Sequence, residues 1–124
     1  MYAPAKPEDV ATLNDPSELE AFDGVLFGIP TRYGSFPAQW RTLWDQTGKQ
    51  WQQGSFWGKY AGLFVSTGTQ GGDLANLDEI HGGSPWGAGT FAGGDGSRQP
   101  SALELRVATA QGKAFYEAVA KAHP

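Results

Sequence analysis

The 124-residue sequence contains no cysteine, which excludes disulfide bonds, thiolate metal sites and cysteine nucleophiles. It also lacks any apolar run approaching the roughly 18 residues that span a membrane. Its first ten residues, MYAPAKPEDV, hold no apolar core typical of a signal peptide. We therefore expect a soluble protein that works in the cytoplasm.

Positive charge is also scarce, because 9 Lys and Arg residues stand against 13 Asp and Glu residues. This balance argues against a nucleic acid or an anionic membrane as the main partner, and it leaves small molecules and protein surfaces. The only histidines, His81 and His123, are isolated, so we expect surface residues rather than metal ligands. The length predicts one domain, residues 1–124.

Glycine is abundant, with 18 of 124 residues against a usual share of roughly 7%. The excess lies after residue 65, in the stretches STGTQGGD, HGGSPWGAGT and AGGDGS. Such loops either let a ligand approach the backbone or simply turn. We predict no strand between residues 72 and 100, where turn-forming residues dominate.

Two short apolar runs predict strands buried on both faces, as in a parallel sheet. They are VLFGI, residues 25–29, and AGLFV, residues 61–65. Each run leads into a polar loop, PTRYG after the first and STGTQGG after the second. The carboxyl ends of neighbouring parallel strands meet at one edge of a sheet, so we expect the polar residues of both loops to converge there.

Three segments predict helices. In NDPSELEAFDG, Asp15 can cap, Pro16 suits the first turn and Glu18 completes a capping box. Residues 37–47 form a helix in this prediction, and Gly48 ends it in a left-handed conformation. Its apolar face comprises Trp40, Leu43, Trp44 and Thr47. Residues 101–121 form the last helix, with a packed face of Leu105, Ala108, Gly112, Phe115 and Val119.

The converging loop residues define a candidate ligand crevice. Backbone amides, hydroxyl groups and one aromatic ring suit a planar heterocycle better than a phosphate chain. The same spacing also fits two ordinary crossover turns, with Arg32 on the surface and Tyr33 covering the core. The residues expected in the crevice are Thr31, Arg32, Tyr33, Ser66, Thr67 and Thr69.

Three sequence blocks resemble a known family. They are FGIPTRYGSFPAQWRTLWDQTG, WQQGSFWGKYAGLFVSTGTQGG and GGSPWGAGTFAGGDGSRQPS, in this order. They are similar to blocks of the WrbA-type flavodoxin-like NAD(P)H:quinone oxidoreductases, especially the fungal members, some of which are known as minor allergens. The resemblance covers essentially the whole chain. It implies an α/β, flavodoxin-like three-layer fold around a parallel sheet, whose strand order in the family is 2-1-3-4-5.

The resemblance also implies a function, an FMN-dependent two-electron hydride transfer from NAD(P)H to a quinone. The flavin does the chemistry and the protein positions it. NAD(P)H would be the co-substrate, and a homo-oligomer, a dimer or a tetramer, the expected assembly. Position by position, the FMN-binding residues would be Thr31, Arg32 and Tyr33 in the first loop, and Ser66, Thr67, Gly68, Thr69, Gln70 and Gly71 in the second.

Trp51 matches an aromatic residue that is thought to border the nicotinamide and quinone site of a neighbouring subunit, which makes it the catalytic candidate. Its alternative role is that of a core or surface indole. The segment SPWGAG, residues 84–89, either approaches the site or forms a structural turn. We interpret GGDGSRQPS as a structural loop that leads into the last helix.

The sequence also departs from the family pattern in two places. Family members carry a strand and a hydroxyl-rich turn around the FMN phosphate before the first residues of this chain. Between Gly72 and Asp73 they carry a helix, a histidine near the flavin and another strand. We therefore expect an incomplete flavodoxin-like domain with an exposed sheet edge. The alternative to a quinone reductase is a non-catalytic, truncated protein without FMN, retained for subunit association.

Overall fold

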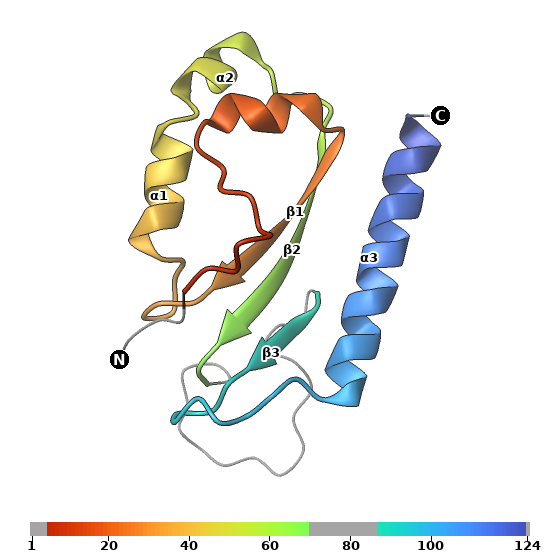
Figure 1. The fold of residues 1–124 in the computed structure, drawn as a ribbon. Helices are drawn as coiled ribbons and strands as arrows, with labels where there is room; N and C mark the ends of the chain where they lie inside the picture. Colours follow the sequence, from red (N-terminus) through yellow and green to blue (C-terminus); the bar gives the residue numbers. More distant parts are fainter. Residues whose placement is uncertain (1–4, 70–86, 124) are drawn as a thin grey trace.

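The computed structural model describes residues 5–69 and 87–123, and Gln70 and Gly71 lie outside these ranges (Figure 1). A parallel sheet lies between two helical layers, which is the predicted α/β arrangement. In chain order the elements are the 3-10 helix η1 (Pro16–Ala21), β1 (Gly24–Pro30), α1 (Ala38–Asp45), α2 (Gly48–Gln53), β2 (Tyr60–Thr67), β3 (Gly89–Phe91) and α3 (Ala102–Ala122).

The sheet has the order β1-β2-β3, and both pairings are parallel. Seven residue pairs join β1 to β2, from Gly24 and Tyr60 to Pro30 and Ser66. The two predicted strands are confirmed, β1 two residues and β2 three residues longer than expected. The prediction of no strand between residues 72 and 100 is wrong, because β3 pairs with the end of β2. Three residues are too few to show an alternating pattern.

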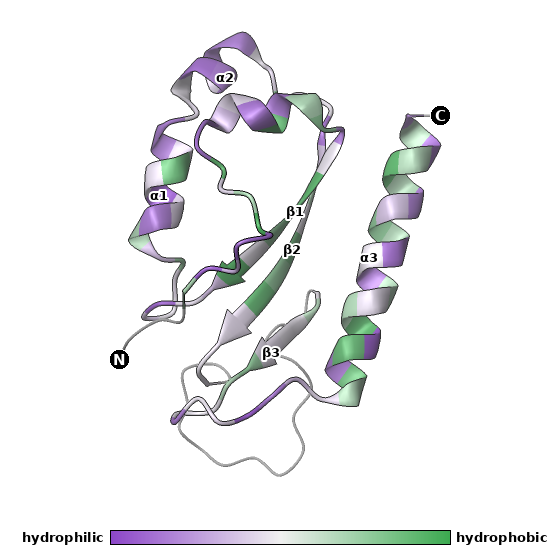
Figure 2. Ribbon diagram, viewed as in Figure 1, coloured by the Kyte–Doolittle hydropathy of each residue, from purple (hydrophilic) through white to green (hydrophobic). Residues whose placement is uncertain are grey.

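The two faces of the sheet are covered by different helices (Figure 1). On one face, the ring of Phe27 meets the edges of Trp40 and Trp44 of α1, with ring centroids 5.6 and 5.4 Å apart. This contact confirms Trp40 and Trp44 of the predicted apolar face, whereas Thr47 lies beyond the end of α1. On the other face, α3 lies over Gly24 and Gly62, where the ring of Phe115 approaches both backbones. Figure 2 shows hydrophobic residues along the middle of β1 and β2.

The predicted helix over residues 37–47 is divided in the structure. Helix α1 ends at Asp45, and α2 begins at Gly48, so the predicted left-handed stop at Gly48 is wrong. The left-handed stop lies instead at Gly54, with φ 65° at the end of α2. The capping boxes of Asp15 with Glu18 and of Ser101 with Glu104 are both present. The first of these segments is a 3-10 helix.

The packing face predicted for α3 is confirmed in its second half, where Gly112, Phe115 and Val119 are half-buried, and is wrong in its first half, where Leu105 and Ala108 are exposed. Leu105 is 56% exposed, whereas Glu104 is buried, and Gln111, Phe115 and Val119 are half-buried towards the sheet. Polar side chains at two of these positions, the buried Glu104 and the half-buried Gln111, hid this part of the face from a search for apolar spacing. In the described part of the chain, no helix combines the length and the hydropathy that crossing a bilayer requires.

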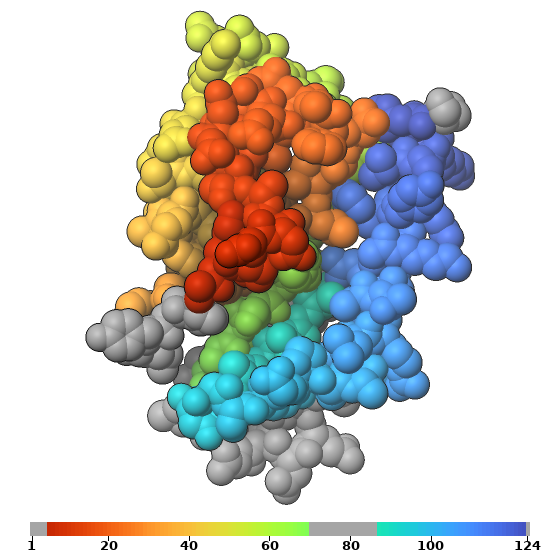
Figure 3. All heavy atoms as spheres, in the orientation of Figure 1, coloured from red at the N-terminus to blue at the C-terminus, as the bar shows by residue number. Residues whose placement is uncertain are grey.

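The described part of the chain buries few hydrophobic side chains. Among the described hydrophobic residues only Ala88 and Phe91 are buried. Figure 3 shows the N-terminal segment and η1 lying between the α1 and α3 layers, where they cover part of the sheet. The expectation of an incomplete flavodoxin-like domain is therefore confirmed.

Candidate functional site

The loops that follow β1 and β2 lie side by side at the carboxyl edge of the sheet. The backbone N–H of Thr31 donates to the carbonyl of Ser66 over 2.8 Å. The hydroxyl of Thr31 donates to Oγ1 of Thr67, also over 2.8 Å, and the Thr67 hydroxyl donates to the carbonyl of Thr69 over 3.0 Å. The structure thus brings the two predicted loops together. The Thr31 hydroxyl proton joins the two loops, and the Thr67 hydroxyl proton bonds within the second loop, so each hydroxyl oxygen keeps a lone pair that can accept a further hydrogen bond.

The first loop is a tight turn that presents an aromatic ring. Arg32 and Ser35 exchange two backbone hydrogen bonds, of 2.6 and 2.9 Å. Between them, Tyr33 and Gly34 both have positive φ values, 49° and 74°, as the two central residues of a type I′ turn do. The Tyr33 side chain is fully exposed beside the crevice. The alternative prediction, in which Tyr33 covers the core, is therefore wrong.

Arg32 also lies at the surface, and its Nη1 donates to the carbonyl of Thr31 over 3.2 Å. The bond holds the side chain back along the first loop, so most of its guanidinium N–H groups stay available to a ligand. In the second loop, a Cβ atom added to Gly68 would meet nothing within 4 Å. The backbone beside the crevice is therefore open to a ligand.

A third segment, which sequence reasoning missed, completes this edge of the sheet. The N–H of Ala92, directly after β3, donates to the carbonyl of Thr67 over 2.8 Å. Thr67 therefore lies between Thr31 on one side and the end of β3 on the other. The sequence signal that could have indicated this contact was the Gly-bounded GTF run, which is short but rich in strand-forming residues.

Arg98 and Glu104 hold the end of β3 against the start of α3, and we call this pair the clamp. The Arg98 Nη2 lies 3.0 Å from Glu104 Oε1, and its Nη1 donates to the Phe91 carbonyl over 2.9 Å. The guanidinium also stacks over the Phe91 ring, 3.7 Å from its centroid. The clamp surrounds one of the two buried hydrophobic residues of the described chain, so it fixes the third segment of the site.

Glu104 is 5% exposed, and its charge is well compensated. Burial alone would raise the pKa of its carboxyl. Hydrogen bonds from the Ser101 N–H and from Arg98, together with the positive charge of Arg98, outweigh this effect, so the pKa lies below its ordinary value of 4.5. The Ser101 N–H donates over 2.6 Å, and the Thr90 hydroxyl over 3.2 Å. The carboxylate is thus a structural anion rather than an acid or base.

The glycine-rich loop after β3 does not form an anion site. In this turn Gly93 and Gly96 have φ values of 79° and 77°. The carboxylate of Asp95 accepts from both the N–H and the hydroxyl of Ser97, at 3.1 and 2.8 Å, which lowers the pKa of Asp95. The donors of Ser97 are therefore used by the Asp95 carboxylate of the same loop, in agreement with the interpretation of GGDGSRQPS as a structural loop.

Trp51 lies apart from the crevice within one chain. It belongs to α2, which lies near the amino end of β2, whereas the crevice follows the carboxyl ends of the strands (Figure 1). Its indole is 83% exposed, so within one chain Trp51 is a surface indole and not a core residue. A contact with a ligand would have to involve the site of a neighbouring subunit, as the resemblance implies.

The predicted isolation of His123 is also wrong, because Nδ1 of this residue lies 3.9 Å from the carboxylate of Asp23. Both groups lie at the amino end of β1, away from the crevice. In the residues that the structure describes, no group of three or more acidic, histidine or cysteine side chains is arranged to hold a metal ion.

Comparison with known proteins gives a consistent result. The sequence model of the family described as NADPH-dependent FMN reductase matches residues 3–95. A protein named minor allergen Alt a 7, from Alternaria alternata, is 63% identical over 153 residues, which cover 99% of this chain and 75% of that protein. A Candida albicans protein named NAD(P)H quinone oxidoreductase PST3 is 47% identical over 151 residues, covering 98% and 75%. Both aligned stretches exceed 124 residues, so these relatives carry residues within the match that have no counterpart here.

Proposed function

The chain belongs to the family of NADPH-dependent FMN reductases, and from this premise we propose that it is an FMN-dependent NAD(P)H:quinone oxidoreductase. The flavin ring would lie at the carboxyl edge of the sheet, between the turn around Tyr33 and the loop that follows β2. The observation that carries the proposal is the pair of hydrogen bonds from Thr31 to Ser66 and Thr67, which joins the two loops into one wall.

The chemistry of this wall fits a flavin ring. The Tyr33 ring offers a flat apolar surface, the open backbone beside Gly68 allows close approach, and Arg32 supplies positive charge. The lone pairs of the threonine hydroxyls can accept from the ring N–H. When bound, FMN supplies the electron-pair transfer between NAD(P)H and the quinone. The residues of this chain then orient the ring and, through Arg32, favour negative charge at its polar edge.

Direct binding measurements test this proposal. The purified chain is titrated with FMN while flavin fluorescence is followed, and oxidation of NADPH is then measured with a benzoquinone as acceptor. We expect saturable binding and quinone-dependent NADPH oxidation. Arg32→Ala should weaken FMN binding, whereas Arg106→Ala, which removes an exposed arginine of α3 away from the crevice, should not. Equal binding by both variants would remove Arg32 from the site.

The proposal assigns Trp51 a role in trans, in the quinone site of a neighbouring subunit. Trp51→Ala should slow turnover with quinone more than it weakens FMN binding. Trp57→Ala is the matched control, because Trp57 is also exposed, at 93%, but lies outside the predicted site. If both substitutions change the kcat with quinone equally, Trp51 has no special role.

One observation favours the alternative function, a non-catalytic flavodoxin-like protein that associates with other subunits without FMN. Among the described hydrophobic residues only Ala88 and Phe91 are buried, as expected of a chain that associates with other subunits. The two functions differ in a simple readout. A colourless protein that shows no flavin binding after incubation with FMN would support the non-catalytic function. A yellow protein that reduces quinone would exclude it.

A further inference from the structure

One residue, Arg98, holds the end of β3. Its Nη1 donates to the carbonyl of Phe91 over 2.9 Å and to the hydroxyl of Thr90 over 3.3 Å. The backbone N–H of Arg98 also donates to the carbonyl of Ala92 over 2.9 Å. Arg98 therefore contacts three successive residues, and the last of them lies directly after β3.

The peptide group between Phe91 and Ala92 lies between Arg98 and the second loop of the crevice. Its oxygen accepts from the Arg98 side chain, and its N–H donates to the carbonyl of Thr67 over 2.8 Å. Because a peptide group is planar and rigid, its oxygen and its N–H move together. A charged donor on the oxygen also polarises the group and strengthens the hydrogen bond that its N–H makes on the other side. The position of Thr67 therefore depends on the position of the Arg98 side chain.

The guanidinium group is itself held by two further contacts. Its Nη2 lies 3.0 Å from Oε1 of Glu104, whose side chain is only 3% exposed, and its plane lies over the Phe91 ring. A planar guanidinium can bond a carboxylate and a carbonyl at the same time in one fixed geometry, which the single ammonium group of a lysine cannot reproduce. Arg98 thus joins the start of α3 to the peptide group that bonds Thr67.

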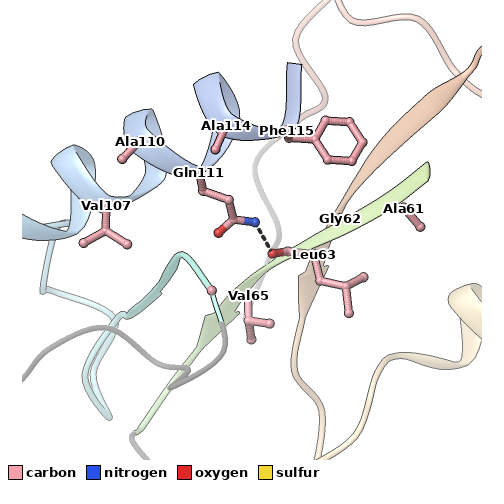
Figure 4. A pocket seen from close by; sticks show the side chains of 10 residues that line it. Ala61, Gly62, Leu63, Val65, Val107, Ala110, Gln111, Ala114 and Phe115 are labelled. Carbon is pink, nitrogen blue, oxygen red and sulfur yellow. Dashed lines mark hydrogen bonds between the residues drawn. The ribbon is translucent and has the colours of Figure 1, made fainter. Parts of the chain in front are cut away.

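A second side-chain link between α3 and β3 lies at the opposite end of this strand. Nε2 of Gln111 donates to the carbonyl of Leu63 over 2.6 Å (Figure 4), and its Oε1 accepts from the N–H of Ala88, directly before β3. Both hydrogen bonds end on residues away from the crevice. Gln111 therefore provides a matched comparison for Arg98, on the same helix and the same strand.

We propose that Arg98 is a positioning residue of the flavin crevice, an inference that rests on the proposed function. Arg98 acts through the peptide group between Phe91 and Ala92 on Thr67, and Thr67 in turn accepts from the hydroxyl of Thr31 over 2.8 Å. The Arg98 side chain thereby sets the spacing of the two loops that receive the ring, without contacting the flavin itself.

Amide hydrogen exchange of the full chain without flavin tests the first step of this inference. Arg98→Gln should speed exchange of the Ala92 N–H at least about tenfold, while the N–H of Tyr60, which donates to Asp23 at the other end of the sheet, should change less than about twofold. Gln111→Ala should leave exchange at Ala92 unchanged. Equal acceleration at Ala92 and Tyr60 would indicate general loosening of the fold and overturn the proposal.

Titration of the same variants with FMN tests the second step. Arg98→Gln should raise the dissociation constant about tenfold, as is typical when the partner that orients a binding group is removed, whereas Gln111→Ala should raise it less than about twofold. Arg98→Lys separates charge from geometry, and it replaces Arg98→Gln in both tests if that variant does not fold. Lysine keeps a positive charge beside Glu104, so it should recover most of the stability in urea but not the FMN affinity. Full recovery of the affinity would reduce the role of Arg98 to the ion pair and overturn the proposal.

These tests distinguish failure of this proposal from failure of the proposed function. If the wild-type chain does not bind FMN, the proposed function is wrong, and exchange at Ala92 still decides whether Arg98 holds this edge of the sheet. If the wild type binds FMN and Arg98→Gln binds it equally well, the proposed function stands and the positioning role is overturned.

Discussion

Tyr33 combines a left-handed backbone with a fully exposed aromatic ring, a combination that costs energy and gains nothing from packing. A non-glycine residue at φ 49° loses about 1 kcal/mol or more relative to its ordinary conformations. Strain of this kind is retained where the side chain serves a ligand. We therefore explain the exposed position of the Tyr33 ring by the proposed flavin contact, because packing within the fold does not require it.

This interpretation predicts separate effects of Tyr33 on stability and on binding. Tyr33→Asn keeps the turn, because asparagine tolerates the left-handed region, so the thermal midpoint should stay the same or rise. The same change removes the ring, and FMN affinity should fall about 3- to 10-fold, as expected for an aromatic contact of about 0.5–1.5 kcal/mol. Fluorescence titration and thermal melting measure the two effects. Tyr33→Phe should behave as the wild type in both, and a loss of affinity in this variant would point to the hydroxyl instead.

The sequence was sufficient to place Thr31 and Thr67 together, since parallel strands deliver their carboxyl ends to one edge. The sequence did not predict the backbone conformation of Tyr33, because tyrosine rarely adopts a positive φ and nothing in the residue type indicates one. Nor did it indicate the clamp, since Arg98 and Glu104 meet only after β3 and α3 have packed. Their contact depends on tertiary structure, which spacing along the chain does not encode.

The junction of β3 and α3 depends on one carboxylate, and its stability should depend on pH. Because the pKa of Glu104 is lowered in the folded chain, the ionised form stabilises the fold. This contribution is fully present above the ordinary value of 4.5 and is lost as the pH falls through the lowered folded pKa.

Glu104→Gln should therefore lower the free energy of unfolding by about 1–3 kcal/mol at pH 7. The difference from the wild type should shrink as the pH falls below 4.5, because the wild-type carboxyl then also becomes neutral. Urea unfolding at a series of pH values measures this change. Glu117→Gln on the exposed surface of α3 is the control, and an equal, pH-independent loss in both variants would contradict a charge-specific role.

Helix α3 lies close to the sheet because two glycines face it. A Cβ atom on Gly24 would lie 2.8 Å from Cγ2 of Val119 and 3.0 Å from the Phe115 ring. Gly112 of α3 is different, since a Cβ there would meet nothing within 4 Å.

Two substitutions of glycine by alanine should therefore have opposite effects on stability. Gly24→Ala should destabilise the chain by about 1–3 kcal/mol, because it overpacks the contact between β1 and α3. Gly112→Ala should stabilise it by about 0.5–1 kcal/mol, because alanine favours the helix. Chemical denaturation of both variants measures the difference. A stabilising Gly24→Ala would show that α3 does not sit against β1 as described.

The described residues form a sheet of three strands, in agreement with relatives that carry residues within the match that have no counterpart here. The missing segments were predicted from sequence blocks, because block order is visible without a structure. The first half of the α3 contact face was not predicted. Leu105 fitted the apolar spacing of the sheet-facing side but is exposed, while the polar side chains of Glu104, which is buried, and Gln111, which is half-buried, lie on the contact side.

An association that supplies the missing burial should couple folding to protein concentration. If a homo-oligomer is the stable form, mass action raises the thermal midpoint as the chain becomes more concentrated. We expect a rise of about 5 °C or more between about 2 and 200 µM, since each kcal/mol shifts the midpoint by several degrees in a domain of this size. Calorimetry at the two concentrations makes the comparison, and a wild-type midpoint that stays constant would show that the monomer folds by itself despite its exposed surface.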